Sequence, residues 1–113
     1  MSKRDSALYI TDILDSIEAI EEFTSDINYE TFINDRKTYS ATLREFMVIG
    51  EAISKIIDLL ETKKPEYPWR MIKDFRNFII HEYFGVNPQI IFDAVRLELP
   101  ELKTLILELT ELK

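Results

Sequence analysis

The sequence feature that most constrains the fold is a long seam of mostly apolar residues in the middle of the chain. Its members recur at alternating intervals of four and three residues: Tyr39, Leu43, Phe46, Gly50, Ile53, Ile57 and Leu60. This spacing is typical of one face of an α-helix, whereas a half-buried strand would alternate at every second residue. The segment from about residue 29 to 62 is therefore predicted to be helical. Asn34 and Asp35 can cap a new helix after a short first piece.

One member of this seam, Gly50, is unusual for the interior of a helix. Glycine costs about 1 kcal/mol relative to alanine at such a position. A glycine here is explained by the close approach of another backbone, or it is simply a tolerated weakness. The sequence leaves these two explanations about equally open.

The remaining segments also carry helical patterns. Residues 5–23 repeat isoleucine and leucine at three- and four-residue spacing, and Ser25-Asp26 then predicts a turn. A further helix is predicted from Pro68 to about Phe84, with Gly85 as a left-handed stop. Asn87-Pro88 combines a cap with a proline and predicts the next helix, and Pro100 is expected to split off a last one.

Together these segments predict an all-α fold in a single domain covering residues 1–113. Four main helices would form a bundle, with one or two short additional helices. No repeat, low-complexity tract or useful strand-type alternation is present in the sequence.

Composition narrows the class of protein. The sequence contains no cysteine, which excludes disulfides and thiolate zinc sites and points to a reducing cytosol. Charged residues near the N-terminus leave no apolar core for a signal peptide, and no uncharged run is long enough to span a bilayer. We therefore expect a cytoplasmic protein without a membrane partner.

The charge is strongly acidic overall but locally basic. A net charge of −7 counts against broad nucleic-acid binding, because the phosphate backbone repels such a chain. Between residues 63 and 81, however, basic side chains outnumber acidic ones. The acidic residues there are only Glu66 and Asp74, and the basic residues are Lys63, Lys64, Arg70, Lys73 and Arg76. Ordinary charge scatter on a solvated helix face gives the same pattern, so charge alone does not decide.

The helix predicted from Pro68 has two apolar sides. With about 100° per residue and Arg76 at zero, an inward sector of roughly 140° holds Ile72, Phe75, Phe78, Ile79 and Tyr83. Ile80 and Phe84 fall outside it, at about 40° and 80°. A helix that is apolar on both sides is usually buried on both. We expect Ile80 and Phe84 to meet a second copy of the chain, although burial within one chain is the alternative.

Polar residues beside this second strip carry the most specific chemistry in the chain. Asn77 and the only histidine, His81, lie four residues apart on one face, with Arg76 beside them. Arginine can hold a phosphate bidentately, and histidine moves protons near neutral pH. A lone histidine near a helix end is, however, commonly only a cap. Without a second histidine, a cysteine or an HExxH sequence, a metal site has little support, and no cofactor is expected.

The sequence RNFIIHEY at residues 76–83 resembles the R-N-x-x-x-H-x-Y motif of HEPN-domain proteins, and most closely that of the HepT-like ribonuclease toxins. The similarity covers nearly the whole chain. Residues 35–38 and 50–52 resemble the second-helix signatures of that group, and Pro68-Trp69 and Leu99-Pro100 follow in the same order. The ordered set is much more specific than the short motif alone.

This resemblance implies a HEPN-type four-helix bundle that forms a homodimer and cleaves RNA without a metal at the two-fold interface. It implies a catalytic pair in Arg76 and His81, with Asn77 in support. It also implies a partner, an MNT-type nucleotidyltransferase antitoxin that adenylylates the motif tyrosine, here Tyr83. The added AMP would block RNA by its bulk and negative charge.

Two features depart from the family pattern. Relatives often carry tryptophan where this chain has Phe92, and the acidic net charge is unhelpful for holding RNA. The grip on RNA would then depend on Lys63, Lys64, Arg70 and Lys73. A second hypothesis is a non-catalytic helical subunit that docks a separate nucleotidyltransferase and helps to present its substrate.

Overall fold

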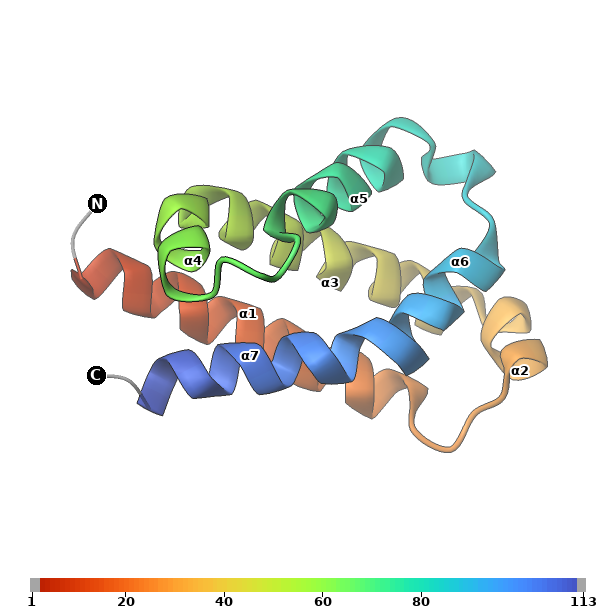
Figure 1. The fold of residues 1–113 in the computed structure, drawn as a ribbon. Coiled ribbons are helices and arrows are strands. Elements are labelled where there is room, and N and C mark those ends of the chain that lie inside the picture. Colours follow the sequence, from red (N-terminus) through yellow and green to blue (C-terminus); the bar gives the residue numbers. More distant parts are fainter. Residues whose placement is uncertain (1–2, 112–113) are drawn as a thin grey trace.

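The computed structural model describes residues 3–111, and all regular structure in that range is helical (Figure 1). The elements in chain order are α1 (Lys3–Thr24), α2 (Tyr29–Asn34), α3 (Arg36–Lys55), α4 (Ile57–Lys63), α5 (Trp69–His81), the 3₁₀ turn η1 (Tyr83–Gly85), α6 (Pro88–Asp93), the π-helical turn η2 (Ala94–Glu98) and α7 (Leu99–Glu111). The predicted all-α class is confirmed.

Four long helical segments form the bundle. Helix α3 lies in its middle and packs against α1 on one side and α5 on the other, while the α6–α7 segment runs back along α1 (Figure 1). The short helices α2 and α4 are the additional pieces. The seam of α3 and α4 faces the core as predicted, because Leu43, Phe46, Ile53 and Leu60 are buried together with isoleucines of α1.

Local capping explains where several helices begin. The carboxylate of Asp35 accepts hydrogen bonds from the backbone N–H of Thr38 at 3.2 Å and from its hydroxyl at 2.8 Å. These bonds satisfy an orphan donor at the start of α3 and lower the pKa of Asp35. Asn87 caps α6 through the N–H of Gln89, with proline at the first helical position. The predicted starts of α3 and α6 are therefore confirmed.

The long middle segment is interrupted at a position that no sequence pattern predicts. Ile56 leaves helical geometry, and its N–H bonds to the carbonyl of Ile53 at 3.1 Å in a tighter turn. No glycine or proline marks this position. The turn redirects the chain so that α4 packs beside α5 and Leu60 reaches the core, so tertiary packing decides it.

Pro100 does not split off a separate helix, and that prediction was wrong. The helix runs on from α6 through η2 into α7. In η2 the N–H of Leu99 bonds to the carbonyl of Ala94, one residue further back than in an α-helix. Proline lacks an N–H and crowds the preceding turn, and a π-helical turn accommodates both effects without ending the helix.

The end of α5 also differs from prediction. The helix stops at His81 and not near Phe84, and among the described residues no glycine has a positive φ, so Gly85 is not a left-handed stop. The 3₁₀ turn η1 follows instead, with the N–H of Gly85 bonded to the carbonyl of Glu82 at 2.7 Å. This turn brings Val86 into the core and starts the reversal toward α6.

Phe92 takes part in an aromatic cluster. Its ring centroid lies 5.3 Å from that of Phe32 and 5.6 Å from that of Tyr29, and the guanidinium of Arg96 sits 4.7 Å above it. These contacts give Phe92 a packing role. Within residues 3–111, no helix is long and apolar enough to cross a membrane.

Candidate functional site

Helix α5 carries the motif and is fixed at both ends. At its start, the buried ring of Trp69 lies 4.7 Å from that of Tyr67 and donates its Nε1–H to the carbonyl of Lys64 at 2.9 Å. Near its end, Ile79 is fully buried. Anchors separated by about three turns leave little freedom for the residues between them.

Arg76 lies where α5 crosses α3, directly against Gly50. A Cβ atom added to Gly50 would lie 2.3 Å from Cβ and 2.6 Å from Cγ of Arg76, closer than any real contact allows. Gly50 therefore marks a close approach between two helices, and the second explanation from sequence, a tolerated weakness, is not needed. No other residue type fits here without moving α5.

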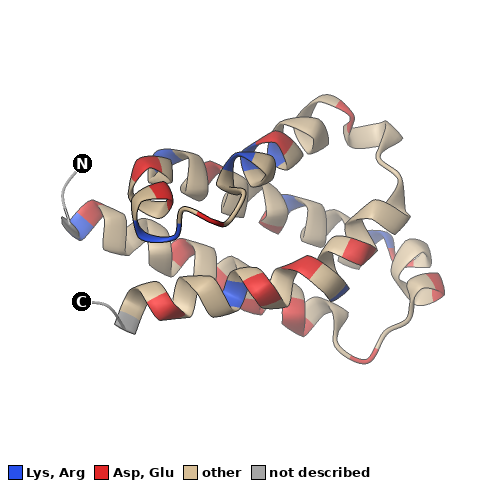
Figure 2. Cartoon of the chain, in the orientation of Figure 1, with Lys and Arg blue, Asp and Glu red and all other residues tan. Residues whose placement is uncertain are grey.

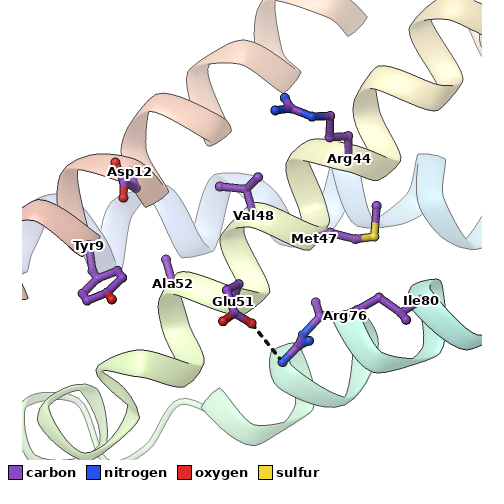
Figure 3. Close-up of a pocket in the computed structure, with 9 residues that line it drawn as sticks. All are labelled: Tyr9, Asp12, Arg44, Met47, Val48, Glu51, Ala52, Arg76 and Ile80. Atoms are coloured by element: carbon purple, nitrogen blue, oxygen red, sulfur yellow. Dashed lines mark ion pairs between the residues drawn. The ribbon is translucent and has the colours of Figure 1, made fainter.

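The head of Arg76 meets an acid from α3. Its Nη2 atom lies 3.2 Å from Oε2 of Glu51 (Figure 3). The arginine side chain is only 19% exposed, whereas Glu51 is 51% exposed. The Nε atom of Arg76 is buried and has no hydrogen-bond partner among the described residues. The guanidinium is thus held at one end and retains further donor capacity.

A shallow, open depression lies beside this ion pair. Helix α1 contributes Tyr9 and Asp12 to its wall, and α5 contributes Arg76 and Ile80 (Figure 3). The α3 side is formed by Arg44, Met47, Val48, Glu51 and Ala52. The lining is mainly apolar with charges at its edge, which suits a ligand that carries both an apolar ring and a phosphate.

Asn77 and His81 do not line this depression. His81 is the last residue of α5 and is exposed, and Asn77 is half-buried one turn earlier. Along one helix, Arg76 and His81 are separated by about 140° around the axis and roughly 7.5 Å along it. Within a single chain, the structure therefore does not gather the predicted catalytic residues around the Arg76 depression.

The two residues predicted at a dimer interface are exposed. Ile80 is 45% exposed and Phe84 is 99% exposed. Phe84 belongs to η1 rather than to α5, so the two do not form one continuous helical strip as predicted. Phe78 was predicted to face inward but is 39% exposed, because α5 packs mainly on α3 and leaves that flank uncovered.

Tyr83 follows α5 in η1 and is half-buried. It lies near Tyr39, whose pKa is raised first by burial and then by the neighbouring Tyr83 and Tyr29. The Tyr39 hydroxyl donates to the carbonyl of Val86 at 3.4 Å. Tyr83 thus sits at the junction between the turn and the start of α3, with part of its surface accessible.

The four predicted RNA-binding cations lie between the end of α4 and the first turns of α5, a stretch where Figure 2 shows blue segments of ribbon. Two of them already have acidic partners. Arg70 makes contacts of 3.2 and 3.1 Å with both carboxylate oxygens of Glu61, and Lys64 lies 3.3 Å from Glu108. Lys63 is exposed and Lys73 half-buried, and neither forms an ion pair within residues 3–111. The local surface is thus less positive than the sequence suggests.

Comparison with known proteins decides the family. The family model described as ribonuclease HepT-like matches residues 13–109, which covers most of the chain and all of the motif. The chain belongs to the HepT-like ribonuclease family. The membership confirms the resemblance found in the sequence and the enzyme class that it implied, a ribonuclease.

Named relatives agree with the HepT-like assignment. A Thermococcus cleftensis protein named "Probable ribonuclease HepT" is 41% identical over 89% of this chain and 92% of its own length. A Methanocaldococcus jannaschii protein named "Putative RNase" is 37% identical over 88% and 83%. A Caldanaerobacter subterraneus protein of the same designation is 34% identical over 91% and 92%. No solved structure matches this HepT-like chain significantly.

Sequence reasoning gave no functional role to Glu51, Tyr9 or Asp12. Glu51 entered only as part of the short second-helix signature at residues 50–52. Its proximity to Arg76 depends on where α3 crosses α5, which no local pattern predicts. The one sequence signal for the contact between Glu51 and Arg76 was Gly50 in the apolar seam. A close approach of another helix at Gly50 also brings the next residue, Glu51, to the crossing.

Proposed function

We propose that this HepT-like protein is an endoribonuclease toxin of a two-gene toxin–antitoxin system and acts without a metal. The observation that carries the proposal is the pairing of a half-buried arginine, held by an acid, with an exposed histidine at the end of the same helix. Family membership supplies the reaction class. The geometry supports a division of roles between the two residues.

In the proposed reaction, the 2′-hydroxyl of the RNA attacks the adjacent phosphorus and the bond to the 5′-oxygen breaks. The products are a 2′,3′-cyclic phosphate and a 5′-hydroxyl end. Arg76 stabilises the charge that develops on the phosphate oxygens, and His81 transfers protons. Asn77, one turn before His81 on the same face, orients the imidazole or the substrate.

A homodimer would supply the second proton-transfer group that a single chain lacks. The reaction needs a base for the 2′-hydroxyl and an acid for the 5′-oxygen, but each chain has one histidine. Two copies related by a two-fold axis would supply two His81 and two Arg76 side chains. The exposure of Ile80 and Phe84 beside these residues supports an interface there.

The proposed partner is an MNT-type nucleotidyltransferase that silences the toxin by adenylylating Tyr83. In this scheme the tyrosine hydroxyl takes the adenylyl group of ATP and pyrophosphate leaves. The modified side chain adds bulk and negative charge near the end of α5. The partial exposure of Tyr83 supports this role, and RNA would then be repelled.

Cleavage by the purified protein in the presence of EDTA tests the function. The wild type should cleave RNA, His81→Ala should fall to background, and Glu82→Gln should retain activity because Glu82 lies beyond the end of α5 and has no proposed role in the reaction. Equal cleavage by wild type and His81→Ala would reject the assigned role. An inactive wild type that still binds the nucleotidyltransferase would favour the non-catalytic subunit.

The proposed modification has its own test. Intact-mass measurement after co-expression with the nucleotidyltransferase should show an added AMP that coincides with lost cleavage. Tyr83→Phe should stay unmodified and active under the same conditions. AMP on that variant would place the modification elsewhere.

A further inference from the structure

Two successive residues of α3 hold Arg76 at two points. Gly50 touches the first carbons of the side chain, because only a residue without Cβ leaves room for them. Glu51 holds the other end through the 3.2 Å contact with Nη2. The stem and the head of the arginine are therefore both fixed by α3, although Arg76 itself belongs to α5; Figure 3 shows the contact of the head with Glu51.

Fixing an arginine in advance matters for phosphate chemistry. A free arginine side chain samples many rotamers, and the guanidinium must present its donors in a defined plane. A group that is already oriented stabilises developing charge without reorganising during the reaction. The contact with Glu51 uses only Nη2, so Nη1 is left to face a ligand.

The same contact contributes little to folding. Glu51 is about half exposed, and its second oxygen lies 3.7 Å from the ammonium of Lys55. Solvent screens this carboxylate, and Lys55 competes for it, so the ion pair adds little to stability beyond the packing of the arginine stem. A carboxylate placed beside the guanidinium also opposes the approach of an anionic substrate. Its presence is thus explained neither by stability nor by substrate attraction.

We propose that Glu51 is a positioning residue for Arg76. Its carboxylate, backed by Gly50, holds the guanidinium in the orientation in which it meets the scissile phosphate. The inference rests on the proposed ribonuclease function and deepens it. Glu51 does not touch the reacting atoms; it acts through Arg76.

The substitution Glu51→Gln tests this role, since it keeps the size of the side chain and removes the charge. We expect kcat for RNA cleavage to fall at least tenfold, because the guanidinium loses its fixed orientation. KM should stay unchanged or decrease, because a negative charge has been removed near the RNA. The melting temperature should change little.

Glu21→Gln is the matched control. The carboxylate of Glu21 joins α1 to α7 through a 2.8 Å ion pair with Lys103. This carboxylate is about as exposed as that of Glu51 and lies far from Arg76. The Glu21→Gln variant should keep wild-type kcat and KM. A second readout is independent of cleavage: the Nε–H signal of Arg76 in ¹⁵N NMR, assigned by its loss in Arg76→Lys. This group should be ordered in the wild type and mobile in Glu51→Gln.

The outcomes separate the two proposals. Unchanged or higher kcat in Glu51→Gln would overturn the positioning role and make Glu51 a competitor of the phosphate. An equal loss of kcat in Glu21→Gln, or an Arg76 signal that stays ordered without Glu51, would overturn it as well. If the wild type does not cleave RNA at all, the proposed function fails, and the NMR measurement alone decides whether Glu51 holds Arg76.

Discussion

Helix α5 separates two concave surfaces of nearly equal size and very different chemistry. The depression beside Arg76 measures about 360 Å³, and a groove on the opposite flank of α5 measures about 390 Å³. The groove lies between α3, α5 and the α6–α7 segment, and exposed apolar side chains such as Met71 and Ile90 border it. The two surfaces therefore do not differ in size. They differ because the guanidinium of Arg76 lines the depression, whereas no arginine is among the described residues that line the groove.

The difference follows from how tightly α5 packs on its neighbours. It approaches α3 closely at Gly50, which places a charged side chain in a partly desolvated setting. Toward α6 and α7 it leaves the groove open, and the polar residues that line the groove are Tyr67, Glu98 and Glu101. The described residues of the groove that carry a charge are acids only, Glu98 and Glu101, which repel an anionic substrate, whereas in the depression Arg44 and Arg76 balance Asp12 and Glu51.

The largest expected effect is a difference in RNA cleavage between a variant in the depression and a variant in the groove. Arg76→Ala should lower kcat for RNA cleavage by about 10²- to 10³-fold, the range typical for removing one donor to developing charge. Met71→Ala, a comparable truncation on the groove side, should stay within about twofold. Similar losses in both variants would remove the distinction between the two surfaces.

The next effect concerns the close helix crossing. Gly50→Ala should lower the free energy of unfolding by about 1–3 kcal/mol, because a methyl group 2.3 Å from Arg76 forces the helices apart. The intrinsic helix preference of alanine, about 1 kcal/mol, offsets only part of this. Urea denaturation measures the change.

Gly85→Ala is the matched control for that variant. An added Cβ there would meet its nearest neighbour, an oxygen of Glu82, at 3.8 Å, an ordinary contact. Its stability should stay near that of the wild type. If Gly50→Ala were as stable as Gly85→Ala, the crossing would not be as tight as described.

A third test asks which flank of α5 meets a second copy. Ile80 and Ile90 are equally exposed, at 45% each, but lie on opposite flanks. Ile80→Glu should weaken the proposed dimer at least tenfold, about 1.4 kcal/mol, in analytical ultracentrifugation. Ile90→Glu should leave it intact. The reverse result would move the proposed interface to the groove.

The smallest effect is confined to alkaline pH. Burial, with the negative field of Glu101 and Glu98, raises the pKa of Tyr67 from 10.0 to about 12. The unfolded chain ionises this hydroxyl first, so the contribution of Tyr67 is complete below about pH 10 and is lost as pH rises toward 12. Between about pH 10 and 12, the free energy of unfolding of Tyr67→Phe should therefore fall less than that of the wild type. Parallel pH profiles in urea denaturation would contradict this assignment.

The sequence by itself determined the class of fold, most helix positions and the motif. Apolar periodicity works because a helix places every third or fourth residue on one face, and the isoleucines of α1 and the seam of α3 are buried accordingly. Caps such as Asp35 and Asn87 were predictable because their hydrogen bonds reach only two or three residues along the chain.

Only the tertiary structure decided the features that depend on distant segments. The turn at Ile56 and the early end of α5 serve packing between helices, so no local breaker announces them. The sequence left two explanations for Gly50, and the crossing with Arg76 selects one. Glu51 and Arg76 meet because α3 and α5 cross there, and periodicity within a single helix carries no information about such a crossing.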